Sequence, residues 1–211
     1  HNATPDNALW PAGYTELEFI ESNRTQYIQD TLDMQITNVV VVDGQYDYTG
    51  SNNMFIAGNA TPTWQTQWCM RVNINGTTAT IHAGGSTIRQ FEYTNNTRHI
   101  WKIDMIEGKG YIDNIQVSSF SGYTQPNQQW AYLGNYFSGG AYGLTKGKTY
   151  SIKVYNSGTL VRNMIPAKHG TTVGMYDTVE GRFFTSAVDG TNFAAGPEVS
   201  TNNVYIPQNQ N

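Results

Sequence analysis

Residues 99–107 read HIWKIDMIE, and this stretch decides the fold. In an extended strand successive side chains point to opposite faces of the sheet, so Trp101, Ile103 and Met105 share one apolar face. His99 and Glu107 lie at the two ends of this face, whereas Lys102 points to the other face. This alternation predicts a strand that is buried on one side, as in a layered antiparallel sheet.

Short strand candidates recur on both sides of this stretch, and turns rich in Gly and Asn separate them. Asn75-Gly76 is typical of a tight hairpin turn that requires positive φ. In the candidate at 148–156 we expect Tyr150, Ile152 and Val154 to face the core. No segment repeats apolar residues at helical spacing over three turns. The expected strands are 17–20, 25–28, 38–47, 54–57, 67–74, 78–83, 88–93, 99–107, 109–112, 115–119, 131–136, 148–156 and 159–166. Together they predict an all-β sandwich or barrel.

The length and the cysteine content favour one domain without disulfide bonds. All-β folds of 211 residues commonly form a single domain, which we place at 11–199 between a lead-in at 1–10 and a polar tail at 200–211. Cys69 is the only cysteine, so no internal disulfide can form. We expect it to be a small buried hydrophobe.

The surface is expected to be neutral and polar. Charged residues make up 13% of the chain and the net charge is −4, so surface polarity comes mainly from amides and hydroxyls. This composition is typical of extracellular, cell-surface and virion proteins. No cluster of Lys and Arg is present, which argues against a nucleic-acid partner. The apolar run at 39–42 is too short for a membrane span.

Two blocks carry a resemblance to known modules. PAGYTELEFIES at 11–22, followed by TQYI at 25–28, resembles the opening of a module common in gut-bacterial surface proteins and phage structural proteins. The stretch at 99–104 with GYIDN at 110–114 is similar to the central strand pair of laminin-G-like domains, with Asn114 where that family has Gly. Further blocks similar to the closing strands lie at 132–135, 147–155, 160–167, 173–177 and 181–185. The resemblance implies a two-sheet antiparallel jelly-roll sandwich of the concanavalin A-like lectin and glucanase superfamily, which hosts lectins, adhesion modules, glycosidases and structural proteins.

An enzymatic alternative rests on ELEFIE at 16–21. Glu16, Glu18 and Glu21 resemble the Glu-x-Asp-x-x-Glu motif of retaining glucanases, in which two carboxylates lie about 5–5.5 Å apart. Here the middle residue is Glu, the motif begins the chain, and a flat strand would point Glu21 away from the other two. We therefore expect no enzyme, but an outward-facing acidic edge with Leu17 and Phe19 in the core.

Metal binding is a second alternative. Laminin-G-like domains sometimes bind calcium at the sandwich rim. Acidic residues near hairpins could supply the carboxylates, with Asp43 and Asp113 as the candidates; the others are Asp47, Asp104 and Asp177. Calcium needs six to eight oxygens, usually from several carboxylates together. The acidic residues here are scattered singly, as turn residues are, so we expect no cofactor.

Aromatic side chains among amides are the favoured binding groups. Sugar rings stack on aromatic rings, while Asn, Gln, Ser and Thr bind the hydroxyls. Such candidates are Trp64, Tyr136, Phe137 and Tyr142, whereas Trp68 and Trp130 are expected in the core. We therefore expect a non-enzymatic module that recognises a glycan or another surface component, displayed in many copies so that weak contacts act together. A purely structural virion or adhesin domain is the remaining alternative.

Overall fold

The computed structural model describes residues 10–50, 52–59, 68–84, 90–137 and 140–199. All regular structure in these ranges is β, and the strand pairs are antiparallel in two large sheets and one small hairpin. The expected two-sheet jelly-roll sandwich is confirmed. The described part contains no helix long and apolar enough to cross a membrane.

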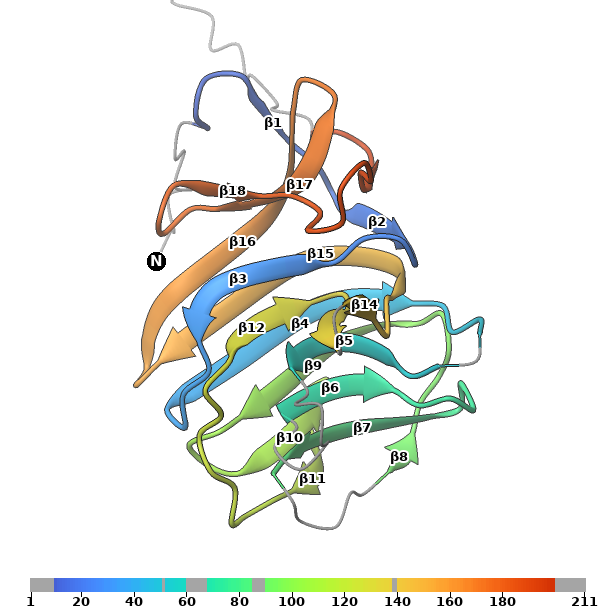
Figure 1. Ribbon diagram of the computed structural model, residues 1–211, viewed down its shortest axis with the longest axis vertical. Coiled ribbons are helices and arrows are strands. Elements are labelled where there is room, and N and C mark those ends of the chain that lie inside the picture. Colours follow the sequence, from blue (N-terminus) through green and yellow to red (C-terminus); the bar gives the residue numbers. More distant parts are fainter. Residues whose placement is uncertain (1–9, 51, 60–67, 85–89, 138–139, 200–211) are drawn as a thin grey trace, which may run out of the picture.

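The larger sheet has eleven strands, and its main path runs through the centre of the molecule (Figure 1). Along this path the strands are β11 (Ile115–Ser119), β10 (Lys109–Ile112), β9 (Arg98–Asp104), β4 (Asn38–Tyr46), β15 (Lys146–Asn156), β16 (Thr159–His169), β17 (Thr172–Asp177) and β18 (Arg182–Phe184). Three short strands join it at the side: β1 (Tyr14–Glu16) pairs with β16, and β2 (Ile20–Asn23) pairs with β15 and β19 (Ala194–Ala195).

The smaller sheet has six strands and packs against part of the larger one. Its order is β3 (Ile28–Asp33), β12 (Gln129–Tyr132), β5 (Met54–Asn59), β6 (Trp68–Val72), β7 (Thr78–Ala83) and β8 (Phe91–Glu92). A separate hairpin is formed by β13 (Asn135–Phe137) and β14 (Gly140–Tyr142). In Figure 1, β1, β17 and β18 lie above β3, so the larger sheet extends past the edge of the smaller one.

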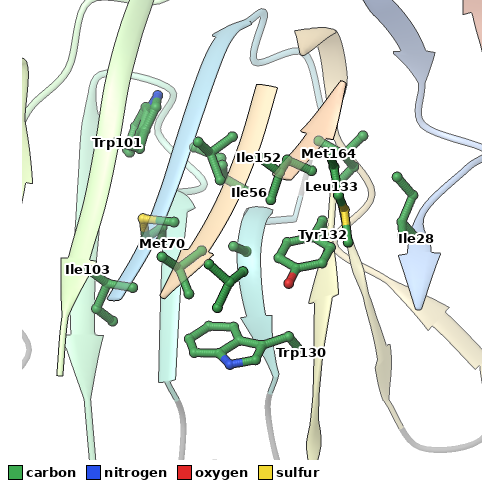
Figure 2. Packing of buried hydrophobic residues seen from close by; sticks show 14 of the residues in the cluster. Ile28, Ile56, Met70, Trp101, Ile103, Trp130, Tyr132, Leu133, Ile152 and Met164 are labelled. Carbon is green, nitrogen blue, oxygen red and sulfur yellow. The ribbon is translucent and has the colours of Figure 1, made fainter. Parts of the chain in front are cut away.

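The core lies between the two sheets. Trp101, Ile103 and Met105 are all buried there, which confirms the alternation in the sequence. Trp68 and Trp130 face them from the smaller sheet and are fully buried, as predicted. Figure 2 shows side chains from both sheets, Ile103 and Met70 among them, pointing into the same layer.

A β-bulge in β15 overturns one orientation that the sequence suggested. The register with β4 shifts between Thr149 and Ser151, which places one extra residue in β15. Ile152 and Val154 face the core as expected, but Tyr150 is only half-buried on the outer face. There the Arg98 guanidinium lies 3.6 Å from the Tyr150 ring centroid.

Several expected strand boundaries are also wrong, each because of local backbone chemistry. The chain bends at Glu18 and Phe19, so no strand covers 17–20, and β3 begins only at Ile28. Leu17 is buried as predicted, whereas Phe19 lies half-buried against Tyr150, with ring centroids 5.6 Å apart.

Turns account for the other boundary changes. The expected strand at 131–136 is interrupted by the left-handed residue Leu133 (φ 65°) and resumes as β13. β9 ends at Asp104, whose carboxylate accepts hydrogen bonds from the backbone N–H groups of Ile106 and Glu107. β1, β14 and β19 lie outside every expected strand, whereas β17 and β18 coincide with the blocks at 173–177 and 181–185 that resemble the family's closing strands.

A buried ion network joins the two sheets beside the core. Arg162 of β16 is 3% exposed, and Asp30 of β3 is fully buried. The Arg162 Nε lies 3.2 Å from both carboxylate oxygens of Asp30, and Nη2 donates to Oδ1 at 3.1 Å. Tyr132 donates its hydroxyl to the same carboxylate at 3.0 Å, and Asp177 lies 3.7 Å from Nη1. This network fixes the position of β3 on the larger sheet.

Candidate ligand-binding pocket at the sandwich rim

Three connections meet at one end of the sandwich and enclose a pocket with a volume of about 210 Å³. They are the turn after β2, the connection from β4 to β5, and the segment that leaves β14. The pocket is lined by Arg24, Asn52, Asn53 and residues 141–144, and we call it the rim pocket.

Arg24 is held in this wall by an unusual backbone conformation. Its φ is 73°, in the left-handed region that non-glycine residues rarely adopt. The turn is stabilised because the Asn23 N–H donates to Gln26 Oε1 at 3.1 Å and the Arg24 N–H donates to the carbonyl of Thr145 at 2.9 Å. Strained residues of this kind cluster at binding sites, since the surrounding structure must hold them in place.

The Arg24 guanidinium is packed but lacks acceptors. It lies over the ring of Tyr48, 5.5 Å from the centroid. A Cβ atom on Gly50 would lie 1.9 Å from Arg24 Nη1, so only glycine at this position leaves room for the guanidinium. Its Nε and Nη2 atoms are buried and have no hydrogen-bond partner.

Among the described residues that line the pocket, Arg24 is the only one with an ionised side chain. Asp47 lies nearby, but Lys146 Nζ donates to its carboxylate at 2.7 Å. That hydrogen bond holds the pKa of Asp47 below its ordinary value, and the charge of Arg24 contributes in the same direction. The Asp47 charge is therefore balanced mainly by Lys146.

The opposite wall is formed by the end of the β13–β14 hairpin beside β5 (Figure 1). The Phe55 N–H donates to the carbonyl of Gly143 at 2.8 Å, and the rings of Phe55 and Tyr142 lie 6.1 Å apart. Gly143 (φ 59°) is required here, because a Cβ would lie 2.4 Å from the Phe55 ring. These contacts fix the half-buried Tyr142 in the pocket wall.

Amide groups complete the lining. Asn53 accepts a hydrogen bond from the Ile74 N–H at 2.9 Å through Oδ1, which orients its side chain at the rim. Asn52 is exposed beside it. Asn135, directly opposite Tyr142 in the hairpin, is fully buried, and neither its Oδ1 nor its Nδ2 has a hydrogen-bond partner. An aromatic ring, amides and a guanidinium are the groups that bind sugar rings, hydroxyls and anionic substituents.

The aromatic candidates from the sequence are placed unequally. Tyr142 lines the rim pocket. Tyr136 and Phe137 lie in β13, with their backbones opposite Ala141 and Gly140 of the same hairpin. Trp64 lies outside the described residues. Sequence reasoning missed Arg24, Asn52 and Asn53. Clustered Asn at 52–53 marks a turn, but nothing in the sequence distinguishes Arg24 from other turn residues.

The three glutamates do not form a cluster in the structure. Glu16 ends β1, where its Oε2 accepts a hydrogen bond from Trp10 Nε1 at 2.8 Å. Glu18 is exposed at the bend, and Glu21 alternates with the buried Ile20 and Ser22 in β2. The bend reverses the alternation, so Glu16 and Glu21 both point away from the core. None of the three lines the rim pocket.

Both calcium candidates are engaged by other groups. Asp43 accepts two hydrogen bonds from Arg98, at 2.8 and 2.7 Å. Asp113 accepts hydrogen bonds from the Ile100 N–H at 2.8 Å and from His99 Nδ1 at 2.7 Å, and these bonds lower the pKa of Asp113 against the opposing effect of burial. Among the described residues, no three His, Cys, Asp or Glu side chains are placed to share a metal ion.

Cys69 is buried in β6, as predicted, and unpaired. Burial raises the pKa of its thiol to about 11, so the thiol is protonated at neutral pH. A protonated, enclosed thiol is a poor nucleophile.

Comparisons with known proteins support the fold. No family model and no curated protein matches the sequence. One similar solved structure is a protein from Bacteroides ovatus ATCC 8483 that is provisionally assigned to carbohydrate binding. It has a TM-score of 0.58 and 11% identity over 89% of this chain and 62% of that chain. Another is a heptameric SAP-like pentraxin from Limulus polyphemus, with a TM-score of 0.46 and 11% identity over 77% of this chain and 94% of that one. The chain thus spans less than two thirds of the Bacteroides protein, and the first likeness shows a shared jelly-roll sandwich.

Proposed function

We propose that this chain is a non-enzymatic carbohydrate-recognition module that binds its ligand in the rim pocket. The observation that carries the proposal is the convergence of the Tyr142 ring, the amides of Asn52 and Asn53, and the Arg24 guanidinium on one pocket. A ring provides the apolar face on which a sugar stacks, and the polar groups bind its hydroxyls. The carbohydrate-binding assignment of the Bacteroides protein agrees with this function.

The size of the pocket sets the expected mode of binding. At about 210 Å³ it is smaller than ordinary small-molecule sites, which are about 300–1,000 Å³. It accommodates one sugar unit or the end of a chain, so single-site affinity is weak. Display in many copies on a cell surface or virion converts weak contacts into firm attachment. The amide-rich surface with few charges suits such an extracellular position.

The proposal includes membership of the concanavalin A-like superfamily, through the laminin-G-like resemblance of residues 99–114. It excludes the hydrolase alternative, because a retaining mechanism needs two carboxylates about 5–5.5 Å apart flanking one bond. The Glu16 carboxylate instead accepts a hydrogen bond from Trp10, and Glu18 lies at a bend between two short strands. The proposal involves no calcium ion, and it is supported by the pairing of the candidate ligands Asp43 and Asp113 with Arg98 and His99.

A glycan array on the purified domain, with an assay for sugar release, tests this function. We expect binding without release, and an affinity loss of about two- to ten-fold in Tyr142→Ala, because one aromatic stacking contact contributes about 0.5–1.5 kcal/mol. Tyr155→Ala is the matched control, since this half-buried tyrosine lies near the opposite end of β15 from the pocket. Absence of any glycan binding would favour a purely structural domain, and sugar release would favour a hydrolase.

A further inference from the structure

We infer that the rim pocket selects saccharides that carry an anionic group, a carboxylate or a sulfate, and that Arg24 determines this specificity. The inference rests on the proposed function and narrows its ligand class. An anionic substituent would supply the acceptor that the guanidinium lacks, while the sugar ring contacts Tyr142.

Arg24 differs from the other strongly held arginines in the described part of the chain. Arg98 forms a two-point contact with Asp43, and Arg162 is bound by Asp30. Arg24 has no carboxylate partner, although its Nε and Nη2 are withdrawn from solvent. A buried donor without an acceptor is costly, and a charged donor more so. The fold nevertheless holds Arg24 in this position.

The surroundings of Arg24 are shaped to hold the guanidinium rather than to neutralise it. Tyr48 covers one side of the group and donates its own hydroxyl to the carbonyl of Gly50 at 2.7 Å. Gly50 (φ 156°) is compatible with the guanidinium only because it has no side chain. The backbone of Arg24 itself lies in the left-handed region, where the surrounding structure must hold a non-glycine residue. A preorganised cation of this kind binds an anion with little further loss of conformational freedom.

The local charge balance favours an anion over a neutral ligand. Lys146 already pairs with Asp47, and none of the described residues in the pocket lining is acidic. The pocket therefore carries the unbalanced positive charge of Arg24. A planar guanidinium binds a carboxylate or sulfate through two parallel hydrogen bonds, which a lysine ammonium cannot reproduce.

Matched glycan pairs test the inference directly. The probes are 3′-sialyllactose and 3′-sulfolactose, each compared with lactose, together with the acidic glycans on the array and their desialylated or desulfated counterparts. We expect acidic glycans to bind at least about ten-fold more tightly than their neutral counterparts, because a charged hydrogen bond contributes about 1.5–3 kcal/mol. We also expect this binding to weaken as salt is raised. Preference for one acidic series identifies the anionic group.

Three variants assign the effect to Arg24. Arg24→Gln should abolish the preference for acidic glycans, and Arg24→Lys should retain only part of it. Arg182→Gln, which removes an exposed arginine on β18, should leave the preference unchanged. The melting temperature of Arg24→Gln should fall by less than about 3 °C, because no ion pair is lost.

Each failure has its own meaning. If neutral counterparts bind as tightly as acidic glycans, or if a folded Arg24→Gln keeps the preference, the inference is wrong while carbohydrate recognition stands. If no glycan on the array binds, both proposals are wrong. If Arg24→Gln does not fold, the salt dependence of the wild-type protein and the Arg24→Lys variant decide: salt-independent binding, or full preference in Arg24→Lys, contradicts the inference.

Discussion

At the scale of single residues, function and stability depend on polar groups whose partners are distant in sequence. Asp30 and Arg162 are separated by 132 positions, and Arg24 meets the rest of its pocket only in the folded chain. Their roles could not be predicted from the sequence, because an isolated Asp or Arg in a strand or turn normally lies in solvent. The burial of Cys69, Trp68 and Trp130 was predicted, since their apolar character alone decides it.

His82 gives a prediction on pH dependence. It is 3% exposed in β7, its Nε2 donates to the carbonyl of Gly84, and burial lowers its pKa below the ordinary value near 6.5. The unfolded chain therefore binds a proton at higher pH than the folded chain does. The stabilising contribution is complete above about pH 6.5 and is lost as the pH falls below it.

Urea unfolding at about pH 7.5 and about pH 5.5 measures this effect. We expect the wild type to lose more stability over this interval than His82→Gln, which has no titrating ring. Equal losses in the two proteins would show that His82 does not contribute.

At the scale of elements, the sequence predicts strands well where alternation is strict and poorly where a bulge or bend changes the parity. β4, β7, β10 and β11 have almost the expected bounds. The bulge at Tyr150 could not be predicted from the sequence, because apolar and polar residues still alternate around it. The bend at Glu18-Phe19 could not be predicted from the sequence either, since both residues also suit a strand.

The turn between β10 and β11 can be tested by substitution. Asp113 (φ 51°) and Asn114 (φ 66°) are both left-handed, which is the geometry of a type I′ hairpin turn. Asn114→Ala should lower the free energy of unfolding by about 1 kcal/mol, because alanine is strained in this region. Asn114→Gly should match or exceed the wild type in urea unfolding. If alanine were tolerated as well as glycine, the turn would have another conformation.

At the scale of the whole molecule, the two sheets form a rigid support for loops at the rim. The hydrophobic layer between the sheets supplies most of the stability, while the Asp30–Arg162–Asp177 network fixes how β3 sits on the larger sheet. The class of fold could be predicted because the core needs only alternating apolar residues. The position of the pocket could not, because it depends on how three separate connections meet.

Arg162→Met tests the network at this scale. The methionine fills a similar volume but leaves the buried carboxylates of Asp30 and Asp177 without their counter-charge. Removing one partner of a buried ion pair costs about 3–5 kcal/mol, and we expect a loss of that size in the free energy of unfolding. Arg162→Lys, which keeps the charge, should lose less. A loss below about 1 kcal/mol in Arg162→Met would contradict a structural role for the network.

The most direct measurement of the central claim is a map of backbone amide chemical shifts on addition of a glycan selected from the array. The rim pocket predicts that the largest changes fall at Arg24, Asn52, Asn53 and residues 141–144, with the sheets between them unchanged. Changes centred instead on Glu16, Glu18 and Glu21, or spread over an outer sheet face, would contradict it.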